Sequence, residues 1–252
     1  MVDIKQAVTA YLQKNNFSKI QLTTALIDMD GVLYDSMKNH TAAWFRMATE
    51  MGIDCERNEF YCYEGMTGVA TINILFQRAY GKNATEEQAK DLYKKKAQYF
   101  IELGEPVLMP DADRMLRTLK ENDITPILVT GSGQNSLLNR LDIDYPNIFQ
   151  PAHRITAHDV THGKPNPEPY LKGMELAHSL PNQSIVIENA PLGVAAGHSS
   201  GCFTIGITTG PIPINEMWDS GADIVFSSMT EFANALPELI GCFKKLFLND
   251  YN

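Results

Sequence analysis

The strongest constraint on the fold comes from residues 23–36, which read TTALIDMDGVLYDS. The apolar run 25–27 is too short for a helix of its own and ends at two carboxylates, Asp28 and Asp30, which suits a buried parallel strand. Ligands of open α/β sheets bind at the carboxyl ends of the strands, so this pair of acids indicates a reactive site. Gly31 then lets the backbone turn sharply away. A simple turn after a strand is the alternative, because Asp and Gly are also turn formers.

Composition limits the class of protein. The chain has 252 residues, of which 44% are hydrophobic and 20% charged, so it can bury a full core in one large domain or two unequal ones. With 21 basic and 30 acidic residues it has no basic field for a polyanion, which argues against nucleic acid and anionic membranes as partners. A small phosphorylated substrate remains compatible with this charge, and we expect a monomer.

The cysteines and the N-terminus bear on location. The four cysteines are widely spread without a Cys-x-x-Cys pair, so neither a zinc site nor a disulfide framework is indicated: Cys55, Cys62, Cys202 and Cys242. The first residues lack the pattern of a signal sequence, and no apolar run is long enough to cross a bilayer. We therefore expect a cytoplasmic protein.

Helical periodicity predicts a helical insertion near the start of the chain. An amphipathic helix is expected over 3–14, before the first strand. Three further helical stretches follow that strand, over 37–51, 70–80 and 85–103. We therefore predict an all-helical cap at 37–105, inserted into a catalytic core made of residues 1–36 and 106–252.

After residue 106 the pattern alternates between helix and strand. Strands are predicted at 126–130, 154–157, 184–187, 203–208 and 223–226. Helices are predicted at 111–122, 167–179, 191–200 and 214–220. This alternation is typical of an α/β fold with a doubly wound parallel sheet.

Three more polar groups occur at strand ends or in loops of this core. Thr130, Gly131 and Ser132 end a strand, and a hydroxyl with free backbone N–H groups can form an anion site, although a polar turn is the alternative. Lys164 lies in a loop stiffened by prolines, where it is either a fixed cation or an ordinary exposed lysine. Another apolar strand ends at Glu188-Asn189, whose oxygen atoms suit Mg²⁺.

These motifs, in this order, resemble those of the haloacid dehalogenase superfamily of phosphotransferases. The four matching elements are Asp28-Met-Asp30-Gly, Thr130, Lys164-Pro165 and Glu188-Asn189, and the resemblance covers about residues 25–226. The helical insertion is similar to the small cap of the β-phosphoglucomutase-like branch. The resemblance implies the same core fold and a phosphoryl-transfer enzyme that uses Mg²⁺.

The resemblance also implies roles for single residues. Asp28 would be the nucleophile that forms an aspartyl phosphate, and Asp30 the acid and base. Asp28, the backbone carbonyl of Asp30 and the Asn189 side chain would hold Mg²⁺, with Glu188 directing a coordinated water. The phosphate oxygens would be neutralised by Lys164 and the Thr130–Ser132 loop, Gly131 included.

The sequence departs from the family pattern at two positions. Relatives usually have Glu-Asp in the fourth motif, where this chain has Glu188-Asn189. The mutases have an arginine in the cap that grips the far phosphate of the sugar, and Gly68 stands in its place. Asn189 removes one negative charge near the metal, and Gly68 weakens the mutase interpretation.

Three cap residues are further candidates. His40 aligns with a cap histidine that assists the mutases, and Lys96 could line the entrance, but both could also be solvated helix residues. Glu64 is either an exposed acid near a helix start or a carboxylate over the site, where it would repel a sugar bisphosphate and could bind the metal of magnesium pyrophosphate.

Three functions therefore stay open, in decreasing order of support. The first is a Mg²⁺-dependent phosphohydrolase that acts on a small phosphorylated metabolite or on pyrophosphate. The second is a sugar phosphate mutase similar to β-phosphoglucomutase. The third is a catalytically weak phosphate-binding protein, for which Asn189 is the only support.

Overall fold

The computed structural model describes residues 3–246, and these form a six-stranded parallel sheet with helices on both faces. The strand order is β5–β4–β1–β6–β7–β8. The strands are β1 (Thr24–Ile27), β4 (Thr125–Val129), β5 (Arg154–Ile155), β6 (Ser184–Glu188), β7 (Phe203–Ile207) and β8 (Ile224–Phe226). The predicted doubly wound fold is therefore confirmed.

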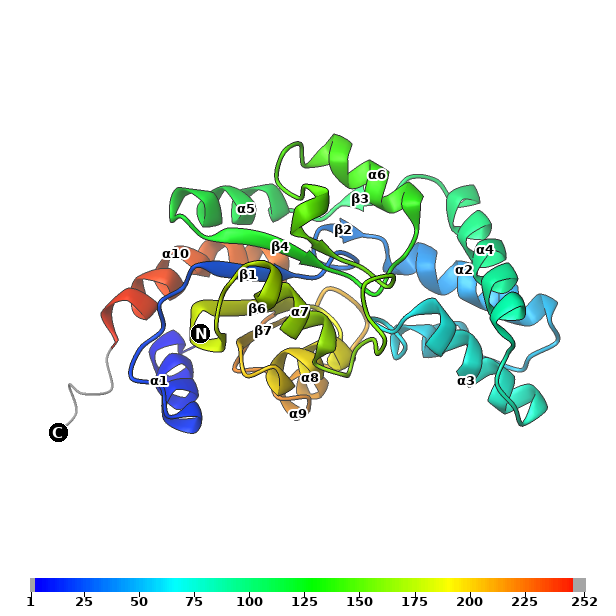
Figure 1. The fold of residues 1–252 in the computed structure, drawn as a ribbon, viewed down its shortest axis with the longest axis horizontal. Helices are drawn as coiled ribbons and strands as arrows, with labels where there is room; N and C mark the ends of the chain where they lie inside the picture. The colour runs from blue at the N-terminus through cyan, green and yellow to red at the C-terminus, as the bar shows by residue number, and fades with distance from the viewer. Residues whose placement is uncertain (1–2, 247–252) are drawn as a thin grey trace.

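The central strands are apolar because both of their faces are covered. Every residue of β1, β6 and β7 is buried, as expected for a parallel strand between two helical layers. Figure 1 shows α5 (Ala112–Glu121) and α6 (Asn135–Asp144) over one face, where α10 (Met229–Lys245) joins the same apolar cluster. The other face packs against α7 (Glu168–Leu176), α8 (Pro191–Ser199) and α9 (Ile214–Asp219). Helices α6 and α10 go beyond the elements expected from the sequence.

The segment between the first strand and α5 is helical and lies beyond the carboxyl ends of the strands (Figure 1). It contains α2 (Met37–Glu50), a 3₁₀ turn at Arg57–Tyr61, α3 (Gly68–Tyr80) and α4 (Glu86–Glu102). Thr85 and Gln88 form a capping box at the start of α4. An unpredicted antiparallel pair, β2 (Tyr34–Asp35) and β3 (Val107–Leu108), joins the two ends of this segment.

The first helix, α1 (Ile4–Asn15), begins one residue later than predicted because Asp3 is its N-cap. Tyr11 fixes the helix to the core: its hydroxyl donates to the Gly201 carbonyl at 2.7 Å and its ring packs edge-on against Phe203. Over residues 3–246 no helix combines the length and apolarity that a membrane span requires. All four cysteines are free thiols.

Candidate active site

Asp28 follows the last residue of β1 and lies in a buried ion cluster. Lys164 Nζ is 2.5 Å from Asp28 Oδ1 and 2.6 Å from Glu188 Oε1, and it also donates to the Val129 carbonyl at 3.0 Å. All three charged side chains are buried. The exposed-lysine alternative for Lys164 is therefore wrong, and three segments far apart in sequence meet at one edge of the sheet.

The environment of Asp28 disfavours its charged form. Burial raises its pKa to about 8, with smaller contributions from Glu188 and Asp30, although Lys164 acts in the opposite direction. Burial alone would lower the pKa of Lys164, but the two carboxylates outweigh burial and raise it. The lysine is therefore charged, and a further cation near Asp28 would favour its ionised, nucleophilic form.

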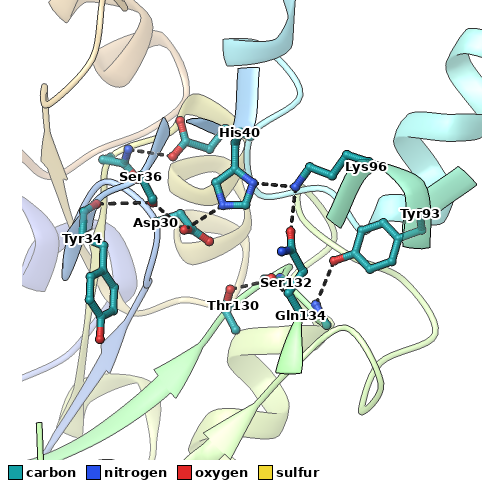
Figure 2. Close-up of polar contacts among 12 residues, drawn as sticks. Asp30, Tyr34, Ser36, His40, Tyr93, Lys96, Thr130, Ser132 and Gln134 are labelled. Atoms are coloured by element: carbon teal, nitrogen blue, oxygen red, sulfur yellow. Dashed lines mark hydrogen bonds and ion pairs between the residues drawn. The ribbon is translucent and has the colours of Figure 1, made fainter. Parts of the chain in front are cut away.

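Asp30 is linked to the cap through a chain of hydrogen bonds (Figure 2). Ser36 Oγ donates to Asp30 Oδ1 at 2.5 Å, and His40 Nε2 is 3.0 Å from the same oxygen. His40 Nδ1 is 2.6 Å from Lys96 Nζ, which also donates to Gln134 Oε1 at 2.8 Å. A lysine ammonium only donates, so Nδ1 is the acceptor and Nε2 carries the proton toward Asp30.

Burial controls the charges along this chain. It lowers the pKa of His40, with Lys96 adding to the effect, and it lowers the pKa of Lys96 to about 7. Burial would raise the pKa of Asp30, but His40 and Ser36 stabilise the carboxylate and bring the pKa below its usual value. His40 and Lys96 are thus not solvated helix residues, unlike the exposed Lys94 and Lys95.

The loop after β4 is held by its own side chains, which accept from two of its backbone N–H groups. Thr130 Oγ1 accepts from Ser132 N at 3.0 Å, and Ser132 Oγ accepts from Gln134 N at 3.3 Å. Gly131 lies against the cap, since a Cβ there would be 2.5 Å from the Gly65 carbonyl oxygen. The loop is therefore covered by the cap in this structure.

The cap contributes Glu64 to the same site. Asn189 Nδ2 donates to Glu64 Oε1 at 2.8 Å, and both side chains are buried. Burial raises the pKa of Glu64 well above its ordinary value; Asn189 opposes this, and the nearby carboxylates of Asp28 and Glu188 add to it. The exposed-acid alternative for Glu64 is wrong.

The donor set fits a hard divalent cation. Asn189 Oδ1 is buried and has no hydrogen-bond partner among the described residues, which a metal ion would supply. The region around Asn189 has an excess of acidic side chains: Asp28, Asp30, Glu64 and Glu188 lie close to one another. Across 3–246, no three His, Cys, Asp or Glu side chains form a ready ligand group.

The carboxylate of Glu188 is held in place by hydrogen bonds from neighbouring residues. Its Oε1 accepts from Lys164 and from the Tyr170 hydroxyl, both at 2.6 Å, and its Oε2 accepts from Asn189 N at 3.0 Å. With these contacts Glu188 orients Lys164 and Asn189. Tyr170, Ser36 and Gln134 were not expected at the site; Tyr170 lies only six residues after Lys164, within the predicted helix 167–179.

A cavity of about 60 Å³ lies between these groups and the cap. Its core side is formed by Asp28, Asp30 and the 130–132 loop, and its cap side mixes aromatic, methionine and charged side chains. The cap side chains include Met37, His40, Trp44, Phe60, Tyr63, Glu64, Met66, Tyr93 and Lys96. The arrangement brings the carboxyl groups of Asp28 and Asp30, the hydroxyl groups of Thr130 and Ser132 and the Lys96 side chain around one small space.

Known proteins share this architecture and sequence pattern. A family model of haloacid dehalogenase-like hydrolases matches residues 22–201. Glycerol-1-phosphate phosphohydrolase 2 of Saccharomyces cerevisiae is 29% identical, with 82% of each chain covered. Beta-phosphoglucomutase of Bacillus subtilis is 26% identical, with 81% of this chain and 88% of that protein covered.

A solved structure from Bacteroides vulgatus, provisionally described as a beta-phosphoglucomutase, is 42% identical and superposes with a TM-score of 0.92 over 96% of this chain and 98% of that one. The relatives thus include both phosphatases and a phosphoglucomutase. The resemblance stated from the four motifs is confirmed, and the chain belongs to the haloacid dehalogenase-like hydrolases.

Proposed function

We propose that the chain is a Mg²⁺-dependent phosphohydrolase that cleaves inorganic pyrophosphate or another compact phosphate compound. The observation that carries this proposal is the position of Glu64, a cap carboxylate buried at the phosphoryl site and hydrogen-bonded to Asn189 at 2.8 Å. A divalent cation beside Glu64 would favour its ionised form, so the side chain could bind a metal ion that a pyrophosphate substrate brings with it. The ionised group would also repel the second phosphate of a bisphosphorylated sugar.

The cavity supports a compact substrate. Its volume of about 60 Å³ in this closed arrangement leaves little room for a hexose ring beside a phosphate. None of the described residues that line it is an arginine, and Lys96 is already bound to His40 and Gln134. A distal sugar phosphate would therefore lack a dedicated cation.

The chemistry follows from the contacts of the two acids. Lys164 holds one oxygen of Asp28, and the carboxylate would attack phosphorus, forming an aspartyl phosphate and breaking the bond to the leaving group. Asp30 would then take a proton from the water that hydrolyses this intermediate. Lys164, Thr130 and the loop N–H groups would neutralise the phosphate oxygens in both steps.

The pKa of Asp30 bears on the leaving group. Because His40 and Ser36 bring this pKa below its usual value, Asp30 is mostly ionised at rest and is a weak proton donor. Phosphate, the leaving group of pyrophosphate, is a much weaker base than a sugar alkoxide and needs less protonation. The acid–base chain therefore suits pyrophosphate better than an alkyl ester.

Mg²⁺ would be held by Asp28, the Asp30 carbonyl and Asn189 Oδ1. When bound, it supplies positive charge that neutralises the phosphate oxygens and favours the ionised form of Asp28. Glu188 would act indirectly, by holding Lys164 and the Asn189 backbone through hydrogen bonds.

A sugar phosphate mutase is the second candidate. It is favoured by the relation to the Bacillus subtilis and Bacteroides vulgatus proteins, and by the link from Asp30 through His40 to the cap. Gly68 and Glu64 argue against it, because neither would hold the far phosphate of a sugar bisphosphate.

The test compares phosphate release with mutase turnover on one preparation. Rates are measured with pyrophosphate, glycerol 1-phosphate and glucose 6-phosphate, with Mg²⁺ and with EDTA, beside conversion of β-glucose 1-phosphate to glucose 6-phosphate. We expect pyrophosphate or the smaller ester to be the best substrate, only with Mg²⁺. Glu64→Ala should lose this preferred activity, whereas Glu56→Ala, at an exposed cap acid, should keep it. Mutase turnover faster than phosphate release, or an unchanged Glu64→Ala enzyme, would overturn the proposal.

A further inference from the structure

The first residue of α3, Gly68, is buried beneath an aromatic ring of another cap helix. A Cβ built on Gly68 would be 2.2 Å from Cδ2 and 2.3 Å from Cε2 of Tyr93. Carbon atoms do not approach this closely, so the ring of Tyr93 occupies the space that any side chain at position 68 would need. Gly68 and Tyr93 are therefore sterically complementary, because the ring lies where a side chain at position 68 would be.

Tyr93 is fixed in this position at both ends. Its hydroxyl accepts a hydrogen bond from Gly133 N at 3.2 Å, so the side chain reaches from α4 to the loop after β4 (Figure 2). Its ring lies 6.3 Å from the ring of Trp44, measured between centroids. Tyr93 also lines the cavity that contains Asp28 and Asp30. The cap side of the cavity therefore includes an aromatic ring that is hydrogen-bonded to the core loop.

We propose that Tyr93 determines substrate size, limiting the site to compact phosphates. This inference rests on the proposed function, since it concerns the size of the leaving group from which the phosphoryl group is transferred. A group larger than phosphate or a short polyol would have to displace a ring that is hydrogen-bonded to the core and packed against Gly68 and Trp44. Shortening the side chain at position 93 would enlarge the cavity where the leaving group lies, without changing a group that carries out the chemistry.

The experiment compares a graded series at position 93. Values of kcat/KM are measured for pyrophosphate and for glucose 6-phosphate in the parent, Tyr93→Phe, Tyr93→Leu and Tyr93→Ala. We expect the ratio of glucose 6-phosphate to pyrophosphate to rise as the side chain shortens, by about tenfold or more in Tyr93→Ala. Tyr93→Phe, which keeps the ring, should stay within about threefold of the parent ratio.

Tyr99→Ala is the matched control. Tyr99 is a buried aromatic residue of the same helix, and it contacts Arg46 and Glu50 rather than the cavity. Tyr99→Ala should lower the stability of the cap without changing the ratio of kcat/KM for glucose 6-phosphate to that for pyrophosphate. An equal rise in Tyr99→Ala would mean that loosening of the cap is enough, and would overturn the assignment to Tyr93.

The pairing with Gly68 supplies an independent test. Gly68→Ala should lower activity and thermal stability in the parent, where its methyl group meets the ring, and should be tolerated in Tyr93→Ala or Tyr93→Leu. An unchanged substrate ratio in folded Tyr93→Leu and Tyr93→Ala would refute the inference even if the parent cleaves pyrophosphate well. A parent that prefers glucose 6-phosphate would instead contradict the proposed function.

Discussion

Asn189→Asp tests the contact between the cap and the fourth motif. In the structure, Asn189 Nδ2 donates to Glu64 Oε1 at 2.8 Å in a fully buried setting. Aspartate has nearly the same shape but no N–H group to donate. The substitution therefore removes this hydrogen bond and places two carboxyl groups against each other.

The magnitude follows from the kind of bond that is lost. A hydrogen bond to a charged group contributes about 1.5–3 kcal/mol. Two unit charges 4 Å apart would in addition repel by ~4 kcal/mol at an effective dielectric constant of ~20. Burial already raises the pKa of Glu64, so the pair would take up a proton, which the two carboxyl groups share, rather than keep both charges. The lower figure is then an upper limit, and at roughly 2–4 °C per kcal/mol for a chain of this size Tm should fall by no more than about 12 °C in EDTA.

The assay is thermal unfolding of four proteins in EDTA and in Mg²⁺: the parent, Asn189→Asp, Glu64→Gln and the double variant. The double variant exchanges the two roles, because the new amide at position 64 can donate to the new carboxylate at position 189. We expect it to regain most of the Tm lost in Asn189→Asp. Mg²⁺ should raise the Tm of Asn189→Asp more than that of the parent, since an anionic oxygen replaces a neutral one beside the cation.

Two results would refute this reasoning. If Asn189→Asp costs as much stability beside Glu64→Gln as beside the native Glu64, the contact between the two side chains contributes nothing. If Mg²⁺ binds Asn189→Asp no more tightly than the parent in a calorimetric titration, Asn189 is not a metal ligand.

Three further predictions follow from the same site. Asp28→Asn should fold normally and lose at least about a hundredfold in turnover. If the variant keeps more than about a hundredth of the parent turnover, and slow deamidation of the new asparagine back to aspartate cannot account for it, a covalent intermediate is excluded. Burial raises the folded pKa values of Asp28, to about 8, and of Glu64 above their unfolded values, so the ionisation of either group at rising pH lowers stability. Mg²⁺ competes with the protons on these two carboxyl groups, so it should raise Tm more at pH 8 than at pH 6. A larger rise in Tm at pH 6 would contradict this prediction. Lys96→Met should lower kcat by about 10²-fold and alter the pH profile, because His40 loses the donor that fixes its tautomer, whereas an unchanged profile would show that Lys96 only packs.

The core of the site was predictable because strand ends are visible in the sequence. Each apolar run stops where the sheet meets the cavity, so Asp28, Thr130 and Glu188 had to lie at one edge once the strands were parallel. Lys164 was harder to place, since only its loop and the resemblance distinguished it from an exposed lysine. Helix α10 contains Pro237, a residue that usually ends helices, which is a physical reason why its pattern is hard to read.

The cap residues were ambiguous because their burial depends on how the cap meets the core. Lys96 nevertheless had a local signal: it lies seven residues after Ala89 and four before Phe100, both on the buried face of α4. A lysine on the apolar face of a helix indicates a buried partner, here His40 and Gln134. The bond between Glu64 and Asn189 had no such signal, since it joins residues 125 positions apart.

That bond gives a physical meaning to the departure in the fourth motif. The resemblance implies Glu-Asp at this motif, and this chain has Glu188-Asn189 with the carboxyl group of Glu64 opposite it on the cap. The chain therefore has an acid on the cap side of Asn189 rather than at position 189 itself. If Glu64 contributes to Mg²⁺ binding, the cation binds best when the cap is closed, and metal affinity and cap closure are thermodynamically linked.

Gly131→Ala tests this linkage without altering a proposed ligand. A Cβ at Gly131 would be 2.5 Å from the Gly65 carbonyl oxygen and 2.9 Å from that of Met66, so the cap loop next to Glu64 would have to move away. We expect Mg²⁺ affinity, measured by calorimetry, to fall about tenfold, as when groups behind a metal site are displaced. Gly133→Ala is the control on the same loop, because it keeps the backbone N–H that donates to Tyr93. The atoms nearest its methyl group belong to the exposed ring of His158, which can turn aside. Equal Mg²⁺ affinity in Gly131→Ala and Gly133→Ala would mean that the cation is held by the core alone, and that Glu64 contributes to specificity but not to metal binding.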